Sequence, residues 1–203
     1  SRGLGDVYKR QMLFLAKATD RLGRVADGNT VLDFDAEEKR RKVTIATAMA
    51  AFDWNNTKIN LLDTPGLFDF AGGVSEGMRA AESALIVLAA GSGVDVGAEK
   101  AYKAASERKI AKLFAVTRCD AENTDFYKTF DALKEEYGAP VCPVVVPYME
   151  GDAVKGYVDF STGKAYAYNG GKASEIAMPA DDRIEEMKEV FNEAVASADE
   201  ELM

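Results

Sequence analysis

The chain has 203 residues, and 34 Asp and Glu against 25 Lys and Arg give a formal net charge of −9 and a sequence pI of about 4.7. Such a length can bury one core and carry an appendage. An acidic chain is poorly suited to wrapping nucleic acid, so we expect no direct sequence-specific nucleic-acid binding. No apolar run approaches the ~20 residues that span a bilayer, and no signal peptide is visible, so we expect no membrane contact and a cytoplasmic location.

The sequence contains no histidine. This absence excludes histidine general bases, Ser-His triads and histidine-ligated metals. Two cysteines, Cys119 and Cys142, are too few for a disulfide scaffold and are predicted to be buried, reduced thiols.

The first part of the chain is predicted to contain one helix, with an irregular segment before it and another after it, and then a hairpin. Residues 1–11 lack an initiator methionine and show no period, so we interpret them as a non-native or unstructured leader. Residues 12–22 have the spacing of a helix, and residues 24–43 are polar and charged, which favours a loop. Residues 44–54 and 58–63 are strand-like and are joined by Asn55-Asn56-Thr57, which predicts an antiparallel hairpin.

Helical and strand-like segments then alternate. The helices are predicted at 72–83, 98–109 and 124–137, and the strands at 84–90, 112–116 and 141–146. This alternation predicts an α/β fold with a doubly wound, mostly parallel sheet and one antiparallel hairpin strand.

The pattern changes after about residue 150. A second hairpin is predicted from 156–160 and 164–168, a loop over 169–181, and an amphipathic helix from Asp182 onward. These segments are interpreted as the start of an inserted α+β subdomain.

Asp63-Thr64-Pro65-Gly66 ends the first hairpin. Nucleotide-switch proteins place such a turn beside Mg²⁺ and the last phosphate of GTP. Asp63 would hold a water on the metal, and the N–H of Gly66 would touch the γ-phosphate, with no Cβ to stop that peptide swinging. The alternative is that these four residues are simply good turn formers.

Thr117-Arg118-Cys119-Asp120 ends a later apolar run. GTP-binding proteins end the corresponding strand in Asn-Lys-x-Asp, and Asp120 would accept two hydrogen bonds from the guanine edge, which adenine does not offer. The chain between the two motifs has room for a helix–strand–helix unit, so both motifs are expected at the carboxyl edge of one parallel sheet, where ligands bind in open α/β folds.

Thr44 follows a charged stretch and precedes the first predicted strand. Its hydroxyl would ligate Mg²⁺ when a nucleoside triphosphate is bound. The alternative is that Thr44 is a β-branched residue that begins an ordinary strand.

Taken together, these segments resemble the GTPase domain of translation elongation factor G, and most closely that factor's paralogues. The resemblance rests on residues 27–35, 41–45, 59–66, 68–70 and 91–97. It implies a P-loop NTPase-like core, GTP and Mg²⁺ as cofactors, the ribosome as partner, and GTP-driven translocation or ribosome disassembly as the activity. Residues 12–149 would be an incomplete translational-type GTP-binding domain, and residues 150–203 the start of the family's inserted subdomain.

The departures from that family are also informative. The family's phosphate-binding loop, G-x-x-x-x-G-K-[ST], would be expected just before Met12 but does not occur in the sequence. The family's water-orienting histidine is replaced by Leu67, and Thr117 and Arg118 replace its Asn-Lys pair. We therefore expect the chain as given to bind nucleotide weakly and to be inactive, with no catalytic residue of its own.

Three interpretations remain open at this point. The first is a piece of a ribosome-associated GTPase whose parent hydrolyses GTP. The second is a switch module that binds GTP or the ribosome without efficient hydrolysis, which Leu67 favours. The third is an unrelated α/β domain.

Overall fold

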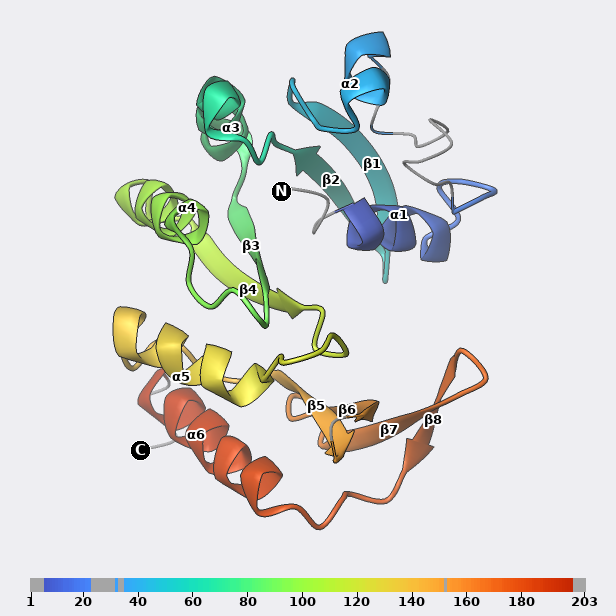
Figure 1. The fold of residues 1–203 in the computed structure, drawn as a ribbon, viewed down its shortest axis with the longest axis vertical. Coiled ribbons are helices and arrows are strands. Elements are labelled where there is room, and N and C mark those ends of the chain that lie inside the picture. Colours follow the sequence, from blue (N-terminus) through green and yellow to red (C-terminus); the bar gives the residue numbers. More distant parts are fainter. Residues whose placement is uncertain (1–5, 23–31, 33–34, 152, 199–203) are drawn as a thin grey trace. The chain divides into compact units, whose positions relative to one another are not determined.

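The structure is a computed structural model, and it describes residues 6–22, 32, 35–151 and 153–198. The chain divides into two compact units: Ser1–Leu88 with Asp95–Ala115, and Ala89–Val94 with Val116–Met203. Figure 1 shows the course of the chain through both units. Each unit is described by itself below.

The hairpin of the first unit consists of β1 (Ala48–Trp54) and β2 (Thr57–Asp63). The strands are antiparallel, and Ala48 pairs with Asp63. Asn55 and Asn56 make the turn with φ of 45° and 62°, a conformation that asparagine tolerates and that suits the twist of a tight hairpin. The predicted hairpin is confirmed.

The start of that hairpin differs from the prediction. β1 begins at Ala48 and not at Thr44, because the N–H groups of Ile45 and Ala46 donate to the side chain of Glu38 and not to a neighbouring strand. Thr44 therefore lies in the connection that precedes the strand.

Two helices precede the hairpin. α1 (Asp6–Leu15) begins and ends earlier than the predicted helix over 12–22 and includes part of the segment that was expected to be a leader. It ends early because Lys17 takes a left-handed φ of 57° and the N–H of Ala18 bonds back to the carbonyl of Leu13. Its Leu13 packs with Leu32 and with Ala48 and Phe52 of β1.

α2 (Ala36–Arg41) lies where the polar sequence predicted a loop. Asp35 caps it by accepting a 2.7 Å hydrogen bond from the N–H of Glu37. Lys42, at φ 56°, ends it. Two caps thus make a helix of a segment without apolar periodicity.

The remaining elements of this unit alternate between helix and strand, as predicted. They are the 3₁₀ turn η2 (Phe68–Phe70), α3 (Ala71–Ala80), β3 (Ser83–Ala89), α4 (Val96–Glu107) and β4 (Ala111–Thr117). β3 and β4 are hydrogen-bonded neighbours. α4 packs on β4 through Tyr102 and Phe114, whose stacked rings lie 5.9 Å apart.

The second unit has a four-stranded antiparallel sheet flanked by α5 (Phe126–Tyr137) and α6 (Asp182–Ala198). Its strands are β5 (Val145–Glu150), β6 (Ala153–Asp159), β7 (Lys164–Asn169) and β8 (Lys172–Ile176). The predicted second hairpin is confirmed as β6 and β7. β8 lies inside the segment that was predicted to be a loop.

The strand predicted over 141–146 is displaced. β5 begins at Val145 and pairs with β6 in the antiparallel sheet. Pro143 explains the shift, since a proline has no N–H for a ladder. Pro147 is tolerated within β5 because β5 is an edge strand of the sheet.

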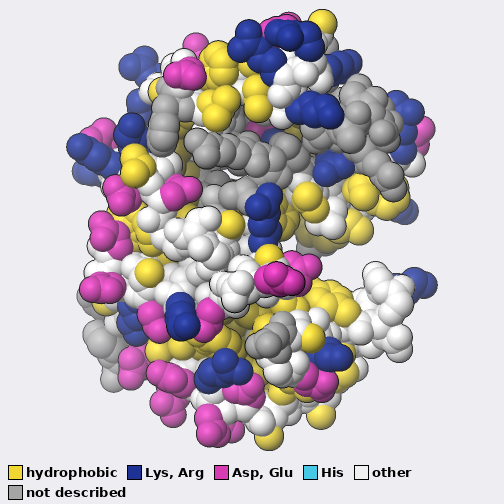
Figure 2. Space-filling view, in the orientation of Figure 1, with side chains coloured by type: hydrophobic (Ala, Val, Ile, Leu, Met, Phe, Trp, Pro, Cys, Tyr) yellow, Lys and Arg dark blue, Asp and Glu magenta, His cyan; other side chains and the backbone are white. Residues whose placement is uncertain are grey.

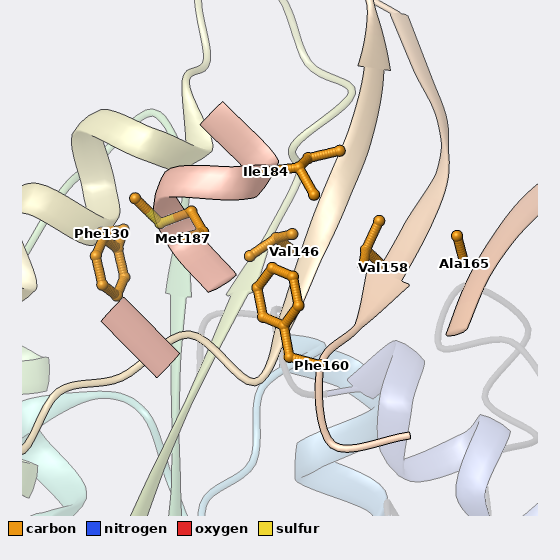
Figure 3. Packing of buried hydrophobic residues seen from close by; sticks show 7 residues of the cluster. All are labelled: Phe130, Val146, Val158, Phe160, Ala165, Ile184 and Met187. Atoms are coloured by element: carbon orange, nitrogen blue, oxygen red, sulfur yellow. The ribbon is translucent and has the colours of Figure 1, made fainter. Parts of the chain in front are cut away.

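The core of this unit lies between the sheet and its helices. Phe130 of α5 and Ile184 and Met187 of α6 pack with side chains of β5 and β6. Figure 3 shows these side chains converging with Val146, Val158, Phe160 and Ala165. The core gives this unit its own apolar centre, and it includes Phe130 and Val146, which lie outside the subdomain predicted over 150–203.

Candidate functional site

Asp63 is the last residue of β2, and its side chain is buried, with 5% of its surface exposed. Its carboxylate accepts a short hydrogen bond from the ammonium of Lys9 in α1, which is itself buried. A buried carboxylate is strongly destabilising unless an opposite charge compensates it. The unit therefore holds a balanced charge pair at the end of its hairpin.

The four residues after Asp63 form the connection to η2. Pro65 is buried, Leu67 is half-buried and Gly66 is exposed. The peptide of Gly66 therefore lies at the surface, where a ligand can reach it. This is the position that the sequence motif predicted for a phosphate contact.

α3 packs directly against this loop because two of its residues have no side chain. A Cβ on Gly73 would lie 2.9 Å from Cδ of Pro65, and a Cβ on Gly77 would lie closer still to Cγ2 of Thr64. Both approaches are closer than side-chain atoms tolerate. The glycine spacing therefore fixes how closely the helix approaches the loop.

Thr44 is also buried, with 6% of its surface exposed. The chain that follows it is tied to α3, because the hydroxyl of Thr47 donates a 2.9 Å hydrogen bond to the carbonyl of Gly73. Since Ala48 pairs with Asp63, the segment after Thr44 and the Asp63 loop lie at the same end of the hairpin. The structure thus brings the segments of Thr44 and Asp63 together within one unit.

The second predicted motif begins at the end of β4, whose last two residues, Val116 and Thr117, belong to the second unit. The carbonyl of Thr117 accepts a 2.8 Å hydrogen bond from the N–H of Ala90. Arg118 has a φ of 56°, so the chain turns sharply after the strand. Arg118 and Asp120 are exposed, and both side chains are accessible to a ligand.

Local hydrogen bonds stabilise the turn after Thr117. The hydroxyl of Thr124 lies 3.2 Å from the carbonyl of Cys119 and 2.7 Å from that of Ala121. The thiol of Cys119 donates to the carbonyl of Val116. Hydrogen bonds among nearby residues therefore stabilise the turn that contains Asp120.

The two thiols are free, as predicted, but each is half-buried and not buried as was expected. Burial raises the pKa of the Cys119 thiol, and the neighbouring carboxylate of Asp120 raises that pKa further. Burial alone raises the pKa of Cys142. Both thiols are therefore neutral near pH 7 and poor nucleophiles.

The oxygens of Thr44 and Asp63 suit Mg²⁺, which prefers hard oxygen donors and is usually held by one or two protein groups together with phosphates and waters. Within the described ranges, no group of three or more His, Cys, Asp or Glu side chains gathers to hold a metal ion. Of the helices described, none is both long and apolar enough to cross a membrane.

Three features of this site were not anticipated from the sequence: the Lys9 partner of Asp63, the glycine contacts of α3, and Glu38. Asp35-x-x-Glu38 is a capping-box spacing and marks a helix start. The structure uses Asp35 in this way but directs Glu38 forward, to Ile45 and Ala46. The capping-box spacing could have indicated the start of α2, but it could not have indicated the contact of Glu38 with Ile45 and Ala46.

The α/β fold is that of a GTP-binding domain, as comparison with a known family shows. The family model described as "Elongation factor Tu GTP binding domain" matches residues 9–199. The chain belongs to this family, which confirms the predicted P-loop NTPase-like fold.

Two relatives extend the comparison. Elongation factor G of Mycoplasma pneumoniae is 29% identical over 198 residues, which cover 95% of this chain and 29% of that protein. A crystal structure of a protein from Thermus thermophilus matches with a TM-score of 0.90 and 31% identity, covering 100% of this chain and 30% of that one. The chain thus spans about three tenths of the length of these relatives.

Gly77→Ala tests the close packing of α3 on the Asp63 loop. The added Cβ would meet Thr64, whose branched side chain has little freedom, so we expect a loss of about 1–3 kcal/mol in the free energy of unfolding. The matched control is Gly72→Ala in the same helix, where nothing lies within 4 Å and alanine should gain up to about 1 kcal/mol. Urea unfolding of both variants measures the difference, and equal effects would contradict the packing described.

Asp120→Asn tests how close the carboxylate lies to the Cys119 thiol. Removal of its charge should lower the pKa of Cys119, so that more thiolate is present at pH 8 and alkylation by iodoacetamide becomes about twofold faster. Cys142 is the internal reference, because only burial shifts its pKa. Peptide mass spectrometry measures both rates, and an unchanged ratio of the two would show that Asp120 does not act on Cys119.

Proposed function

We propose that the chain is the guanine-nucleotide-binding part of a translation factor of the elongation factor G type, which binds and hydrolyses GTP with Mg²⁺ on the ribosome. The family match over residues 9–199 supports this assignment most directly. The similarity to elongation factor G of Mycoplasma pneumoniae supports a role in translation. We further propose that the protein works in the cytoplasm, in translocation or in ribosome disassembly.

In this proposal Thr44 and Asp63 hold the metal. The buried oxygens of both residues belong to segments that lie at one end of the β1–β2 hairpin. Thr44 would act through its hydroxyl and Asp63 through a water. A bound Mg²⁺ would neutralise charge on the phosphate oxygens.

The residues from Thr64 to Gly66 would bind the terminal phosphate. The exposed position of Gly66 supports a contact through its N–H. Since glycine has wide conformational freedom, the peptide could turn away after the phosphate leaves. Pro65, buried against α3, would transmit that movement to the helix.

The guanine base would bind the loop from Thr117 to Asp120. The carboxylate of Asp120 would accept hydrogen bonds from the guanine edge, and the guanidinium of Arg118 would lie over the base. Their exposure supports this assignment. Thr117 and Cys119 are the buried and half-buried members of the same turn and would hold its shape.

A second candidate is a switch module that binds GTP or the ribosome without efficient hydrolysis. Leu67 follows the Asp63 loop and can neither donate nor accept a hydrogen bond through its side chain, and the sequence has no histidine. A water-orienting group would then have to come from outside these residues. The ribosome could supply the electrostatic stabilisation.

Nucleotide binding and ribosome stimulation separate the two candidates. Labelled GTP and GDP are titrated with Mg²⁺ into the chain as given and into an extended chain, the full-length product of its gene. Binding with ribosome-stimulated phosphate release supports the GTPase, and binding without release supports the switch module. Failure of the extended chain to bind either nucleotide would exclude both.

Asp120→Asn in the extended chain tests the base-binding assignment. An amide in place of the carboxylate cannot accept both guanine hydrogen bonds but suits xanthine, so preference for GTP over XTP should fall by about 100-fold or more. Competition binding measures the preference. Glu122→Ala, an exposed neighbour in the same loop, is the control. An unchanged preference in Asp120→Asn would remove Asp120 from the base site.

A further inference from the structure

Two acidic side chains among the described residues are almost fully buried, those of Asp63 and Glu38. Glu38 is 1% exposed, although it belongs to a charged helix on which its neighbours Lys39 and Arg40 are exposed. Burying a carboxylate in this way is unfavourable unless it is hydrogen-bonded. The contacts of Glu38 show what it holds.

Four backbone N–H groups on both sides of Thr44 bond to this one residue. The main-chain carbonyl of Glu38 accepts from the N–H of Lys42 and, at 3.3 Å, from that of Val43. Its side-chain Oε1 accepts from Ile45 at 2.9 Å and from Ala46 at 3.1 Å. The chain is therefore fixed immediately before and immediately after Thr44.

The rest of the segment is fixed from α3. The hydroxyl of Thr47 bonds to the carbonyl of Gly73, so the segment lies between a side chain of α2 and the backbone of α3. No strand ladder holds residues 44–47, because β1 begins at Ala48. The Oε1 atom of Glu38 thus replaces the ladder at Ile45 and Ala46.

The second carboxylate oxygen of Glu38 does not take part in these contacts. Oε2 is buried and has no hydrogen-bond partner in the described part of the chain. The contacts to Ile45 and Ala46 need only one acceptor oxygen, which an amide also provides. Glutamine at this position should therefore keep both contacts, whereas alanine should lose them.

We propose that Glu38 is a positioning residue that sets the conformation of Thr44 by accepting the N–H groups of Ile45 and Ala46. The inference rests on the proposed function only in assigning Thr44 a role toward Mg²⁺ and the triphosphate. Glu38 touches no reacting group and acts through Thr44.

Amide hydrogen exchange on the 203-residue chain tests the contact without any nucleotide. In Glu38→Ala the N–H groups of Ile45 and Ala46 should exchange about tenfold faster, since each loses its acceptor. Glu38→Gln should keep their protection. Glu37→Ala is the matched control, because the adjacent carboxylate of Glu37 bonds to Arg40 and Arg41 and not to this segment. Unchanged exchange in Glu38→Ala would overturn the inference.

Nucleotide affinity of the extended chain tests the consequence. Glu38→Ala should weaken Mg²⁺·GTP binding about tenfold while GDP affinity stays unchanged, and Thr44→Ala should do the same. Glu38→Gln should restore GTP affinity. Equal losses for GTP and GDP would show a general loss of stability and overturn the positioning role.

The exchange experiment and the affinity experiment together distinguish a failure of this inference from a failure of the proposed function. If the wild-type extended chain binds no nucleotide but exchange responds as expected, the proposed function fails and the structural role of Glu38 stands. If nucleotide binds and exchange at Ile45 and Ala46 does not respond, the proposed function stands and the role of Glu38 fails.

Discussion

The buried charge pair at the end of β2 is the constraint on which the first unit depends. Asp63 is 5% exposed and bonds to the ammonium of Lys9. Either charge alone would be strongly destabilising in that position, so the hairpin end and α1 are held to one another by electrostatics as well as by the apolar contacts of Leu13. A bound cation near Asp63 would compete with Lys9 for the same carboxylate, and metal binding would then be coupled to the position of α1.

α3 contacts both the Asp63 loop and the segment that follows Thr44, which are two of the three segments of the proposed site. It meets Thr64 and Pro65 through Gly77 and Gly73, and it bonds to Thr47 through the Gly73 carbonyl. Because these contacts are tight, neither loop can move far without the helix. This packing would transmit a movement of either loop to the helix when a phosphate is lost, and it supports the proposed switch behaviour.

The second unit presents a different kind of surface. The outward face of α6 carries acidic side chains, among them Glu185, Glu186, Glu189 and Glu193. Figure 2 shows acidic side chains gathered over the part of the molecule that contains α5 and α6. The apolar face of the same helix packs against the sheet through Ile184 and Met187. The division of α6 into two faces is what its sequence period predicts.

Much of the fold could be predicted because it depends on local signals. Asn55 and Asn56 mark the hairpin turn, Asp95 and Asp125 cap α4 and α5, and the apolar runs mark β3 and β4. The positions of Asp63 at the end of β2 and of Thr117 at the end of β4 followed from the same signals.

The rest depends on single residues and on contacts that a hydrophobic period does not record. The late start of β1 is set by Glu38, the displacement of β5 by prolines in a segment that is otherwise strand-like, and the early end of α1 by the left-handed Lys17. The Lys9 partner of Asp63 is 54 positions away in the chain. A period or a motif carries no information about such pairs.

The central proposal is that the Thr44 segment, the Asp63 loop and the Asp120 loop bind one guanine nucleotide. A titration of the ¹⁵N-labelled extended chain with Mg²⁺ and GTP tests it most directly. The amide signals of Thr44, Gly66 and Asp120 should shift together with one dissociation constant, and ATP should leave them in place. Signals that shift with different dissociation constants, or equally with ATP, would contradict it.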